Sequence, residues 1–357
     1  MNAPFPLTGE TAALVDLRDP GEFSRVEGFV ADMAGEGATP FHRPAWLRAI
    51  ERGTGQKATG IIAEKCGMLT GWLPLTEVHS AIFGRALISS GFAVGGGALA
   101  KRQETIDKLC RSASELAVRT CCPTVELRND AAPAEWDRVS DKHCGFTADL
   151  AEDDEAQLLA IPRKQRAEVR KGLKNSLTVT TGSLQHDRAA HYAIYAQSVR
   201  NLGTPVFPRS LFDHVLREFG DKADILTVWD GGQPVASVLS LYHAGMVMPY
   251  WGGGTFAARN LRANELMYFE LMLHARRKGC ERFDFGRSKT GSGPYNYKKN
   301  WGFEPEPLTY ASWTAPGAEK RNIDPNDESY SAKINLWKRL PLPIANILGP
   351  PIARGLA

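Results

Sequence analysis

The residues best suited to chemistry lie in the last third of the chain, in the segment SGPYNYKKNWGFEPEP from Ser292 to Pro307. Two adjacent lysines stand there among aromatic residues, in a run too polar for a buried strand and too aromatic for an ordinary surface loop. The chemistry on offer is electrostatic, because a lysine ammonium held away from water stabilises a developing negative charge. The glycines and Pro294 predict a turn, and the aromatic side chains predict the wall of a cleft.

The strand-like run ERFDFGRS, directly before this segment, adds a carboxylate and a further cation. Its alternation places Phe283 and Phe285 on one face and Arg282 and Asp284 on the other. Asp284, at the expected end of the strand, is a candidate general base. The alternative is a carboxylate that pairs with Arg282 or Arg287.

Several common catalytic and metal-binding patterns are absent from the sequence. The eight histidines show no ligand spacing, and neither a P-loop nor a G-x-S-x-G motif occurs. The six cysteines fit no zinc or redox motif. We therefore expect no metal and expect the cysteines to be reduced, small, buried residues.

The chain repeats itself once. The segments FHRPAWLRAI and FPRSLFDHVL each begin a helix that is followed by strand, glycine turn, strand, triple glycine, long helix and short strand. The offset is 166 residues at the pair Phe41 and Phe207 (207 − 41) and 158 residues at the pair Glu126 and Asp284 (284 − 126). Loop-length changes explain that drift. We expect two related α/β (α+β) domains, each a mixed, largely antiparallel sheet flanked by helices.

The repeat and the composition of its flanks set the domain boundaries. They predict an N-terminal domain over residues 1–155, a basic joining helix over 156–180, a C-terminal domain over 181–315 and a tail over 316–357. The tail mixes apolar residues with lysines and arginines, as an interfacial helix does, but four prolines interrupt it. Packing on the second domain is the favoured interpretation, and contact with a membrane surface is the alternative.

The joining segment IPRKQRAEVRKGLKNS carries six basic residues and one glutamate. At helical spacing Arg163, Arg166 and Arg170 fall on one side, and Val169 and Leu173 on another. A solvated helix face is the ordinary interpretation of such a charge run. The alternative is a cradle for a phosphate-bearing ligand, which a place between two domain copies favours.

The two triple glycines have different neighbours. Gly95–Gly97 predicts a close approach of the backbone to another segment. Gly252–Gly254 follows Tyr250 and Trp251, so a cleft wall is an equal alternative there.

The overall composition is that of a globular protein, with 43% hydrophobic and 23% charged residues. The formal net charge of +3 does not indicate a DNA-binding protein. The sequence shows neither a signal peptide nor 18 consecutive apolar residues, so we expect a cytoplasmic location. Its oligomeric state does not follow from the sequence.

The chain resembles the FemAB-like proteins, a branch of the GNAT superfamily with two tandem acetyltransferase folds. The resemblance rests on three features in this order: the duplicated domain, the helix PRKQRAEVRKGLK and the ending FDFGRSKTGSGPYNYKKNWGFEP. With the tail WKRLPLPIANILGPPIARGL, the chain looks like the FemAB-related proteins of the PEP-CTERM/exosortase system. The resemblance runs from about Phe41 to the end.

The resemblance implies acyl or aminoacyl transfer to an amine on a cell-envelope peptidoglycan or exopolysaccharide precursor. The family's aromatic–lysine pair is matched by Tyr297-Lys298, with Gly302-Phe303 behind it. The resemblance gives Lys298 the role of stabilising charge on the carbonyl oxygen or the departing donor. The candidate base, Asp284, follows from its place at the strand end and not from the resemblance. The candidates for binding the anionic precursor are Arg163, Arg166, Arg170, Tyr250, Trp251, Arg287, Ser288, Tyr295 and Tyr297.

The acyl donor is left as aminoacyl-tRNA or acyl-CoA. Coenzyme A enzymes of the superfamily cradle pyrophosphate with a glycine-containing turn before the long helix. Here the turn is AARNLRANELM, which has Arg259 and Arg262 as cofactor-binding candidates but no glycine. Two alternatives stay open: a CoA-dependent N-acyltransferase, and a non-catalytic module that binds an anionic glycan or tRNA.

Overall fold

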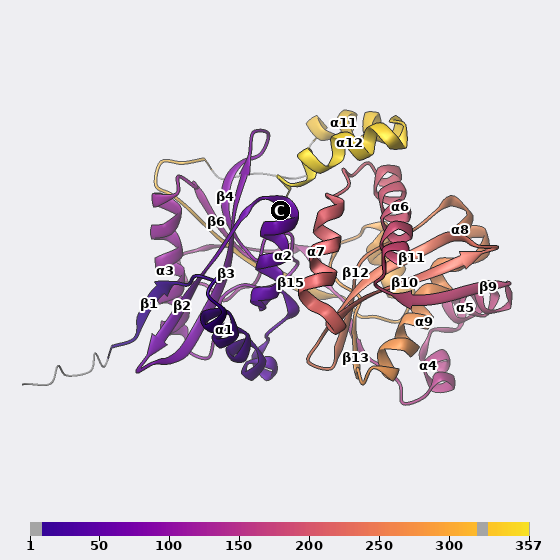
Figure 1. Cartoon of the computed structure of the whole chain (residues 1–357), viewed down its shortest axis with the longest axis horizontal. Helices are drawn as coiled ribbons and strands as arrows, with labels where there is room; N and C mark the ends of the chain where they lie inside the picture. Colours follow the sequence, from indigo (N-terminus) through magenta and orange to yellow (C-terminus); the bar gives the residue numbers. More distant parts are fainter. Residues whose placement is uncertain (1–8, 320–327, 357) are drawn as a thin grey trace, which may run out of the picture. The chain divides into compact units, whose positions relative to one another are not determined.

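The computed structural model describes residues 9–319 and 328–356. In the helix that begins at Glu328, side chains are described from Lys333 onward. The chain forms two compact units (Figure 1). The first unit takes in the chain up to Ser140, a strand segment from Thr309 and the residues from Arg354. The second takes in Asp141–Leu308 and the two C-terminal helices.

The first unit contains these elements: β1 Thr11–Leu14, α1 Pro20–Asp32, α2 Pro44–Thr54, β2 Lys57–Lys65, β3 Met68–Ser80, β4 Gly84–Ser89, β5 Leu99–Ala100, α3 Gln103–Arg119 and β6 Thr124–Leu127. The second unit contains β8 Thr147–Asp149, α4 Asp154–Ala160, α5 Arg163–Lys174, β9 Leu177–Gly182, α6 Gln185–Leu202, α7 Arg209–Phe219, β10 Ala223–Asp230, β11 Gln233–His243, β12 Met246–Gly254, α8 Phe256–Leu261, α9 Ala263–Arg277, β13 Arg282–Asp284, β14 Ser288–Lys289, α10 Gly293–Asn300, α11 Glu328–Arg339 and α12 Leu342–Ala353. The chain passes from one unit to the other within β7 Asp137–Gly145 and β15 Glu306–Thr314. Three short 3-10 turns are Ala34–Glu36, Pro40–His42 and Gly220–Lys222.

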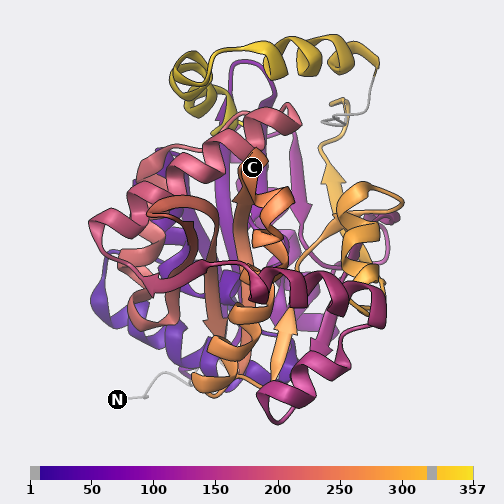
Figure 2. The same ribbon diagram turned by 90° about the vertical axis from the view of Figure 1, so that its right-hand side faces the viewer.

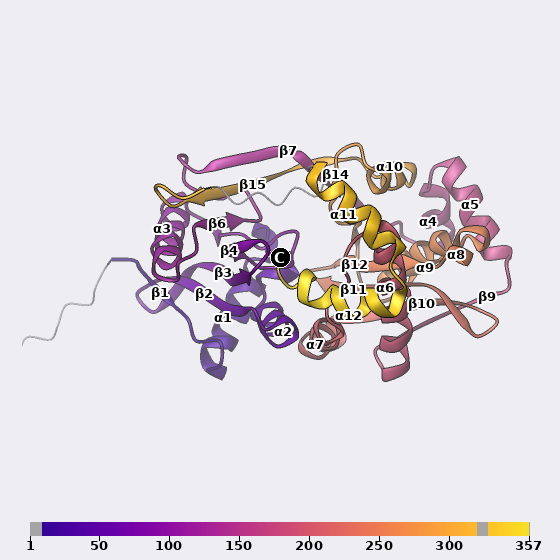
Figure 3. The ribbon, with the colours of Figure 1, turned by 90° about the horizontal axis from the view of Figure 1, so that it is seen from above.

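The sheet of the first unit runs in the order β1-β2-β3-β4-β6-β15, with β5 on β3. Neighbouring strands are antiparallel except β4 and β6, which are parallel. Alternate residues of β2 face opposite sides, as strand geometry requires. Ile61 and Ala63 pack in the core under α3, whereas Ile62 packs with α1 and α2. Figure 3 shows the sheet between these two layers.

The sheet of the second unit runs in the order β8-β13-β12-β11-β10-β9. Figure 2 shows the strands and helices of this unit in magenta to orange. Here β12 and β13 form the parallel pair, and the other neighbours are antiparallel. Helix α9 covers one face, where Leu226, Val238 and Phe283 join its apolar side chains in one core. Helices α6 and α7 contact the sheet through β10, β11 and β12.

The predicted repeat and α/β class are confirmed. The order α2-β2-β3-β4-α3-β6 in the first unit matches α7-β10-β11-β12-α9-β13 in the second, with the extra helix α8 before α9. Each copy has its parallel pair at the same place, between the third strand and the strand after the long helix. The hairpin turns also match, because Cys66-Gly67 and Gly231-Gly232 all have positive φ, as type I′ turns require.

The units do not follow the predicted boundaries. Residues 141–155 were assigned to the first domain, but β8 pairs with β13 in the second unit, with Thr147 opposite Asp284. Residues 309–315 were assigned to the second domain, but Ala311 of β15 pairs with Leu127 in the first unit. Short strands that pair across long sequence distances give no local signal in the sequence.

Four of the six cysteines, Cys110, Cys122, Cys144 and Cys280, are buried as expected. The expectation is wrong for Cys66 and Cys121, which are exposed at positions with φ of 52° and 55°. Both sit in tight turns, where the left-handed backbone carries the side chain outward.

The triple glycines serve close backbone approach in both copies. A Cβ on Gly97 would lie 1.9 Å from Asn129 Oδ1, as the sequence interpretation requires. A Cβ on Gly253 would lie 2.5 Å from the Cβ of Ser198, so this glycine lets α6 pack directly on β12.

We expect Gly253→Ala to lower the free energy of unfolding by about 1–3 kcal/mol, because the added methyl overpacks the contact between β12 and α6. Ser198→Gly in the same chain removes the opposing side chain and should restore part of this loss. Urea denaturation of both single variants and the double variant measures the coupling. Strictly additive effects would show that the two residues do not press on each other.

Candidate active site

The turn after β13 is the first component of the site. Phe283 and Phe285 are buried and Arg282 is exposed, which confirms the predicted alternation. The turn continues through Gly286 at φ 75°, whose N–H donates to Asp284 Oδ1 over 2.8 Å. The alternative of a pair between Asp284 and Arg282 is not seen, since Arg282 Nε lies 3.8 Å from Asp149 instead.

The second component is α10. The turn expected around Pro294 is instead the start of this helix, because Ser292 caps it by accepting from the N–H of Tyr295, and Pro294 lies in its first turn. A turn does occur at Trp301-Gly302. A serine cap followed by proline at the helix start is a recognised initiation pattern. Gly302, at φ 89°, follows the helix end.

Lys298 of α10 reaches back to the turn after β13. Its Nζ donates to the carbonyl oxygens of Gly286 at 2.9 Å and Arg287 at 3.1 Å. The same atom lies 5.3 Å from the ring centre of Phe146 and 5.6 Å from that of Phe285. The residue is only 8% exposed, so its ammonium is held by two carbonyls and two aromatic faces.

The electrostatics of the site follow from burial. The pKa of Lys298 is lowered to about 8: desolvation is the main cause, the charge of Arg287 adds to it, and the carboxylate of Asp284 opposes both. Desolvation also raises the pKa of Asp284, against the Gly286 N–H and the charge of Lys298. The two groups therefore titrate closer to neutrality than a free lysine and a free aspartate, which suits proton transfer.

The neighbouring lysine differs. Lys299 is exposed, and its Nζ lies 5.8 Å from the ring centre of Tyr295. Lys299 therefore faces solvent, and it provides a matched control for Lys298.

The aromatic residues of α10 line the same cluster. Tyr295 meets Phe146 edge-on at 5.4 Å, and Tyr297 lies 6.1 Å from Tyr268 of α9. Burial, reinforced by the negative charge of Glu265, raises the pKa of Tyr297 well above its usual value. Sequence reasoning missed Phe146, Glu265 and Tyr268, since nothing marks them apart from core residues.

Two buried hydroxyls of the site lack a hydrogen-bond partner among the described residues. Ser288 Oγ is one, and Tyr297 Oη, although near the Trp301 indole, makes no hydrogen bond of ordinary geometry. Buried polar atoms are seldom left unpaired, so these are positions where a ligand would gain hydrogen bonds.

The basic helix α5 lies in the second unit. Gln165, Val169 and Gly172 form its buried side, and a Cβ on Gly172 would lie 2.9 Å from the carbonyl oxygen of Arg262. Leu173, expected beside Val169, is 43% exposed, because its position turns it away from that side.

The arginines predicted on α5 point mostly to solvent. Arg163 and Arg170 are exposed, whereas Arg166 donates to the carbonyl of Leu159 over 2.8 Å. The start of the helix adjoins the lysine-bearing segment, since Pro162 contacts Gly302. The structure thus brings Arg163 to the same region as α10.

The two cofactor-binding candidates differ in their surroundings. Arg262, at φ 54°, begins α9 and its Nε lies 2.5 Å from Glu168 of α5. Arg259 is exposed, with its guanidinium 5.3 Å from the ring centre of Phe256. Arg259 lies in the short helix α8, whereas Arg262 is the left-handed residue between α8 and α9.

Tyr250 and Trp251 lie elsewhere in the second unit. Trp251 is 5% exposed and packs against Phe212 of α7 at 4.9 Å and Tyr250 at 4.7 Å. The expected cleft wall is therefore not seen at Trp251, because α7 covers it. Neither residue belongs to the aromatic cluster around Lys298.

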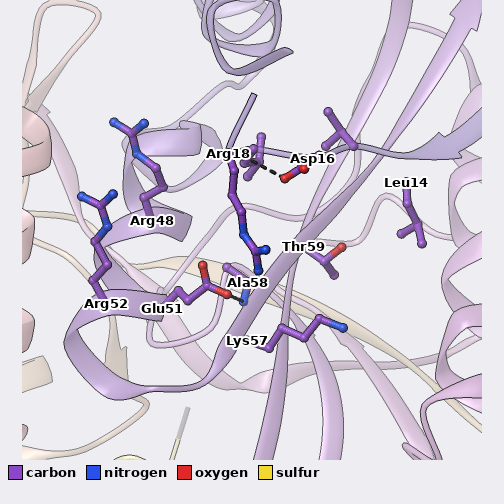
Figure 4. Close-up of a pocket in the computed structure, with 11 residues that line it drawn as sticks. Leu14, Asp16, Arg18, Arg48, Glu51, Arg52, Lys57, Ala58 and Thr59 are labelled. Carbon is purple, nitrogen blue, oxygen red and sulfur yellow. Dashed lines mark hydrogen bonds between the residues drawn. The ribbon is translucent and has the colours of Figure 1, made fainter. Parts of the chain in front are cut away.

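A cavity of about 570 Å³ lies in the first unit, where no predicted site residue contributes (Figure 4). Its polar lining has both signs of charge: Asp16, Arg18, Arg48, Glu51, Arg52 and Lys57. Figure 4 shows Arg18 directed toward Glu51, which accepts from the N–H of Ala58. A surface of mixed charge is not the dry, single-signed environment that stabilises an oxyanion, so we do not assign the chemistry to it.

Within the described part of the first unit, three side chains bring metal-ligand atoms together, although their spacing in the sequence follows no metal-binding motif. The ligand atoms of Glu77, His79 and Cys122 lie within 4.8 Å of one another. His79 Nε2 and Glu77 Oε1 already form a hydrogen bond of 2.7 Å, and burial raises the pKa of the Cys122 thiol. Both effects stabilise the set without a metal.

The second unit is similar in sequence to a known protein family. A family model described as an acetyltransferase (GNAT) domain matches residues 163–299. No curated protein sequence matches the chain.

Three solved structures share the fold over most of the chain. FemX has a TM-score of 0.65 at 13% identity, with 84% of this chain and 96% of FemX covered. A tandem GNAT protein from the clavulanic acid biosynthesis pathway has a TM-score of 0.55 at 13% identity, with 87% and 100% covered. The C-terminal domain of a putative lysylphosphatidylglycerol synthetase from Agrobacterium fabrum has a TM-score of 0.52 at 13% identity, with 80% and 92% covered.

These likenesses agree with the element order of both units and with the predicted duplication. The chain therefore has the fold of tandem GNAT proteins, and residues 163–299, which hold Lys298, match the model of an acetyltransferase (GNAT) domain.

Proposed function

We propose that the protein transfers an acyl or aminoacyl group to an amine on a cell-envelope peptidoglycan or exopolysaccharide precursor. The observation that carries the proposal is the buried Lys298 ammonium beside Asp284, at the end of β13 in an acetyltransferase domain. We expect the reaction to occur in the cytoplasm. An association with the PEP-CTERM/exosortase system stays a prediction from the resemblance.

Acyl transfer to an amine requires one general base and one cation. The amine nitrogen attacks the carbonyl carbon of the donor, a C–N bond forms, and the carbonyl electron pair moves to oxygen. The tetrahedral intermediate then expels the donor's thiolate or alkoxide. Asp284 accepts the proton that the amine loses, and Lys298 stabilises the negative charge on the carbonyl oxygen or on the departing group.

The hydrogen bonds of Lys298 leave one N–H donor of its ammonium for stabilising negative charge on the substrate. An ammonium has three N–H donors, and the carbonyls of Gly286 and Arg287 accept two of them. The third remains for the substrate. The same two hydrogen bonds fix the direction of the ammonium before substrate arrives, so little reorganisation is needed in the transition state.

The exposed cations of α5 suit the anionic part of the substrate. Arg163 and Arg170 are solvent-exposed, and the start of α5 adjoins Gly302 behind the lysine. Guanidinium groups bind phosphate oxygens in a fork geometry. We assign them to the phosphate of a nucleotide- or lipid-linked precursor, or to the backbone of a tRNA donor.

The donor is more consistent with aminoacyl-tRNA than with coenzyme A. Helix α8 fills the place before α9 where the resemblance would put a phosphate-binding turn, and Arg262 is paired with Glu168. Glu265, in the first turn of α9, adds a carboxyl to the end that would meet pyrophosphate. The match to an acetyltransferase domain model keeps acyl-CoA as the second candidate.

Lys298→Ala should reduce acyl transfer by at least about a hundredfold, the usual scale for losing an electrostatic donor of this kind. Transfer from alanyl-tRNA and from acetyl-CoA to glucosamine and to a lysine-containing stem peptide is followed by mass spectrometry. Lys299→Ala is the matched control and should keep full activity. Unchanged turnover in a folded Lys298→Ala protein would sink the assignment.

Activity should fall as the pH rises through about 8, because Lys298 then loses its charge. It should also fall on the acid side, as Asp284, whose pKa is raised, becomes protonated and can no longer accept the amine's proton. The pH profile of kcat/KM tests both limbs. Lys298→Arg should move the alkaline limb upward, since arginine stays protonated; an unmoved limb would assign it to another group.

Coenzyme A should bind weakly or not at all to the wild-type protein in isothermal titration. If it does bind, Arg259→Ala should weaken the binding more than Arg262→Ala, because Arg262 is already paired with Glu168. Tight CoA binding that is insensitive to Arg259→Ala would favour a backbone pyrophosphate site and the CoA-dependent reaction.

A further inference from the structure

Helix α12 contains no charged residue over its whole length, Leu342–Ala353. One side of it consists of small residues at four-residue spacing, Ala345, Gly349 and Ala353, all buried. These let α12 pack closely on α6 and on Val206, which would lie 3.0 Å from a Cβ on Gly349. The helix therefore already uses one side to bind its own unit.

Apart from the half-buried Asn346, the remaining surface of α12 is apolar and open. Ile344, Ile347 and Leu348 are 44%, 72% and 47% exposed. A helix at a water-facing surface ordinarily carries polar residues on its outer side, as α5 does with Arg163 and Arg170. A helix that is apolar on all sides is typical of burial in a protein or of contact with lipid.

Helix α11, which precedes it, supplies positive charge beside this apolar surface. Leu336 is 66% exposed, and Lys333, Lys338 and Arg339 are exposed around it. Between Lys333 and Ala353 the sequence holds no Asp or Glu. The three cations equal the formal net charge of the whole chain, +3.

Both helices pack on α6, and Figure 3 shows them in yellow, one following the other. We call their outer residues the apolar–basic surface: Leu336, Ile344, Ile347 and Leu348 with Lys333, Lys338 and Arg339.

We propose that the apolar–basic surface docks the protein on an anionic membrane surface, with α11 and α12 lying in the plane of the lipid headgroups. Apolar side chains enter the boundary of the acyl chains while lysine and arginine meet the lipid phosphates, which is how interfacial helices bind. The charges of the apolar–basic surface are all positive, which an anionic phospholipid surface requires and a protein partner does not.

The dimensions of the helices favour lying on the membrane over crossing it. A helix of 12 residues is roughly 18 Å long, well short of the roughly 30 Å hydrocarbon core of a bilayer. Among the described helices, none combines the length and apolarity that crossing requires. Pro341 and Pro343 lie at the start of α12, where a proline costs no helical hydrogen bond, and Pro350 and Pro351 lie in its last turn.

The test is sedimentation of the full chain with vesicles. Wild-type protein should bind vesicles of phosphatidylglycerol and phosphatidylcholine, and bind phosphatidylcholine alone more weakly. Replacing Ile347→Glu and Leu348→Glu together should weaken binding by about tenfold or more, because each buried apolar side chain contributes on that scale. Lys338→Gln with Arg339→Gln should remove the preference for phosphatidylglycerol.

Met68→Glu is the matched control, since Met68 is 70% exposed in a hairpin of the first unit. It should leave vesicle binding unchanged, and thermal melts of all variants should match the wild type. Two results would overturn the proposal: wild-type protein that stays in the supernatant, or a doubly charged variant that binds as well as wild type. Light scattering that shows a dimer split by the α12 changes would instead make the surface an interface between copies. Vesicle binding requires no catalysis, so its outcome is independent of the acyl-transfer proposal.

Discussion

The site depends on one constraint, the burial of the Lys298 ammonium. Removing a cation from water is costly, and the protein offsets the cost with two carbonyl oxygens, two aromatic faces and the nearby carboxyl of Asp284. Four of these partners, Asp284, Phe285, Gly286 and Arg287, come from the end of β13 and the turn after it, and Phe146 comes from a separate segment. The same contacts that make the lysine tolerable therefore fix the turn, the helix and the strand end in one arrangement.

The first unit shows what the same fold does without that lysine. Its counterpart of β13 is β6, and the residue aligned with Asp284 is Glu126, which lies 3.9 Å from Arg128. Arg128 stacks on Tyr310, and Asn129 donates to the carbonyl of Ala98. The strand end is thus used for packing and ion pairing within the unit. Duplication followed by divergence of this one region accounts for an equipped copy and a structural copy.

The sequence was sufficient for the fold because its signals are local and appear twice. The glycine turns at Gly67 and Gly231-Gly232, the apolar strands and the long helices carry enough periodicity to define the copies. It was insufficient for the boundaries, which depend on strand pairing over long distances, as for Thr147 with Asp284. In the site, the importance of Lys298 came from the resemblance, and its environment came only from the structure. Trp251 was misplaced because an aromatic residue beside glycines looks the same on a cleft wall and in a core.

The central claim is that the Lys298 ammonium is buried, polarised and close to losing its proton at neutral pH. NMR titration of the protein with labelled lysine side chains, assigned by the Lys298→Arg variant, measures this directly. We expect one lysine with a pKa of about 8, well below the usual value of 10.5, and expect this resonance to be the one missing from the variant. A Lys298 that titrates with the exposed lysines near 10.5 would contradict it, because such a side chain would be solvated and could not form the site described.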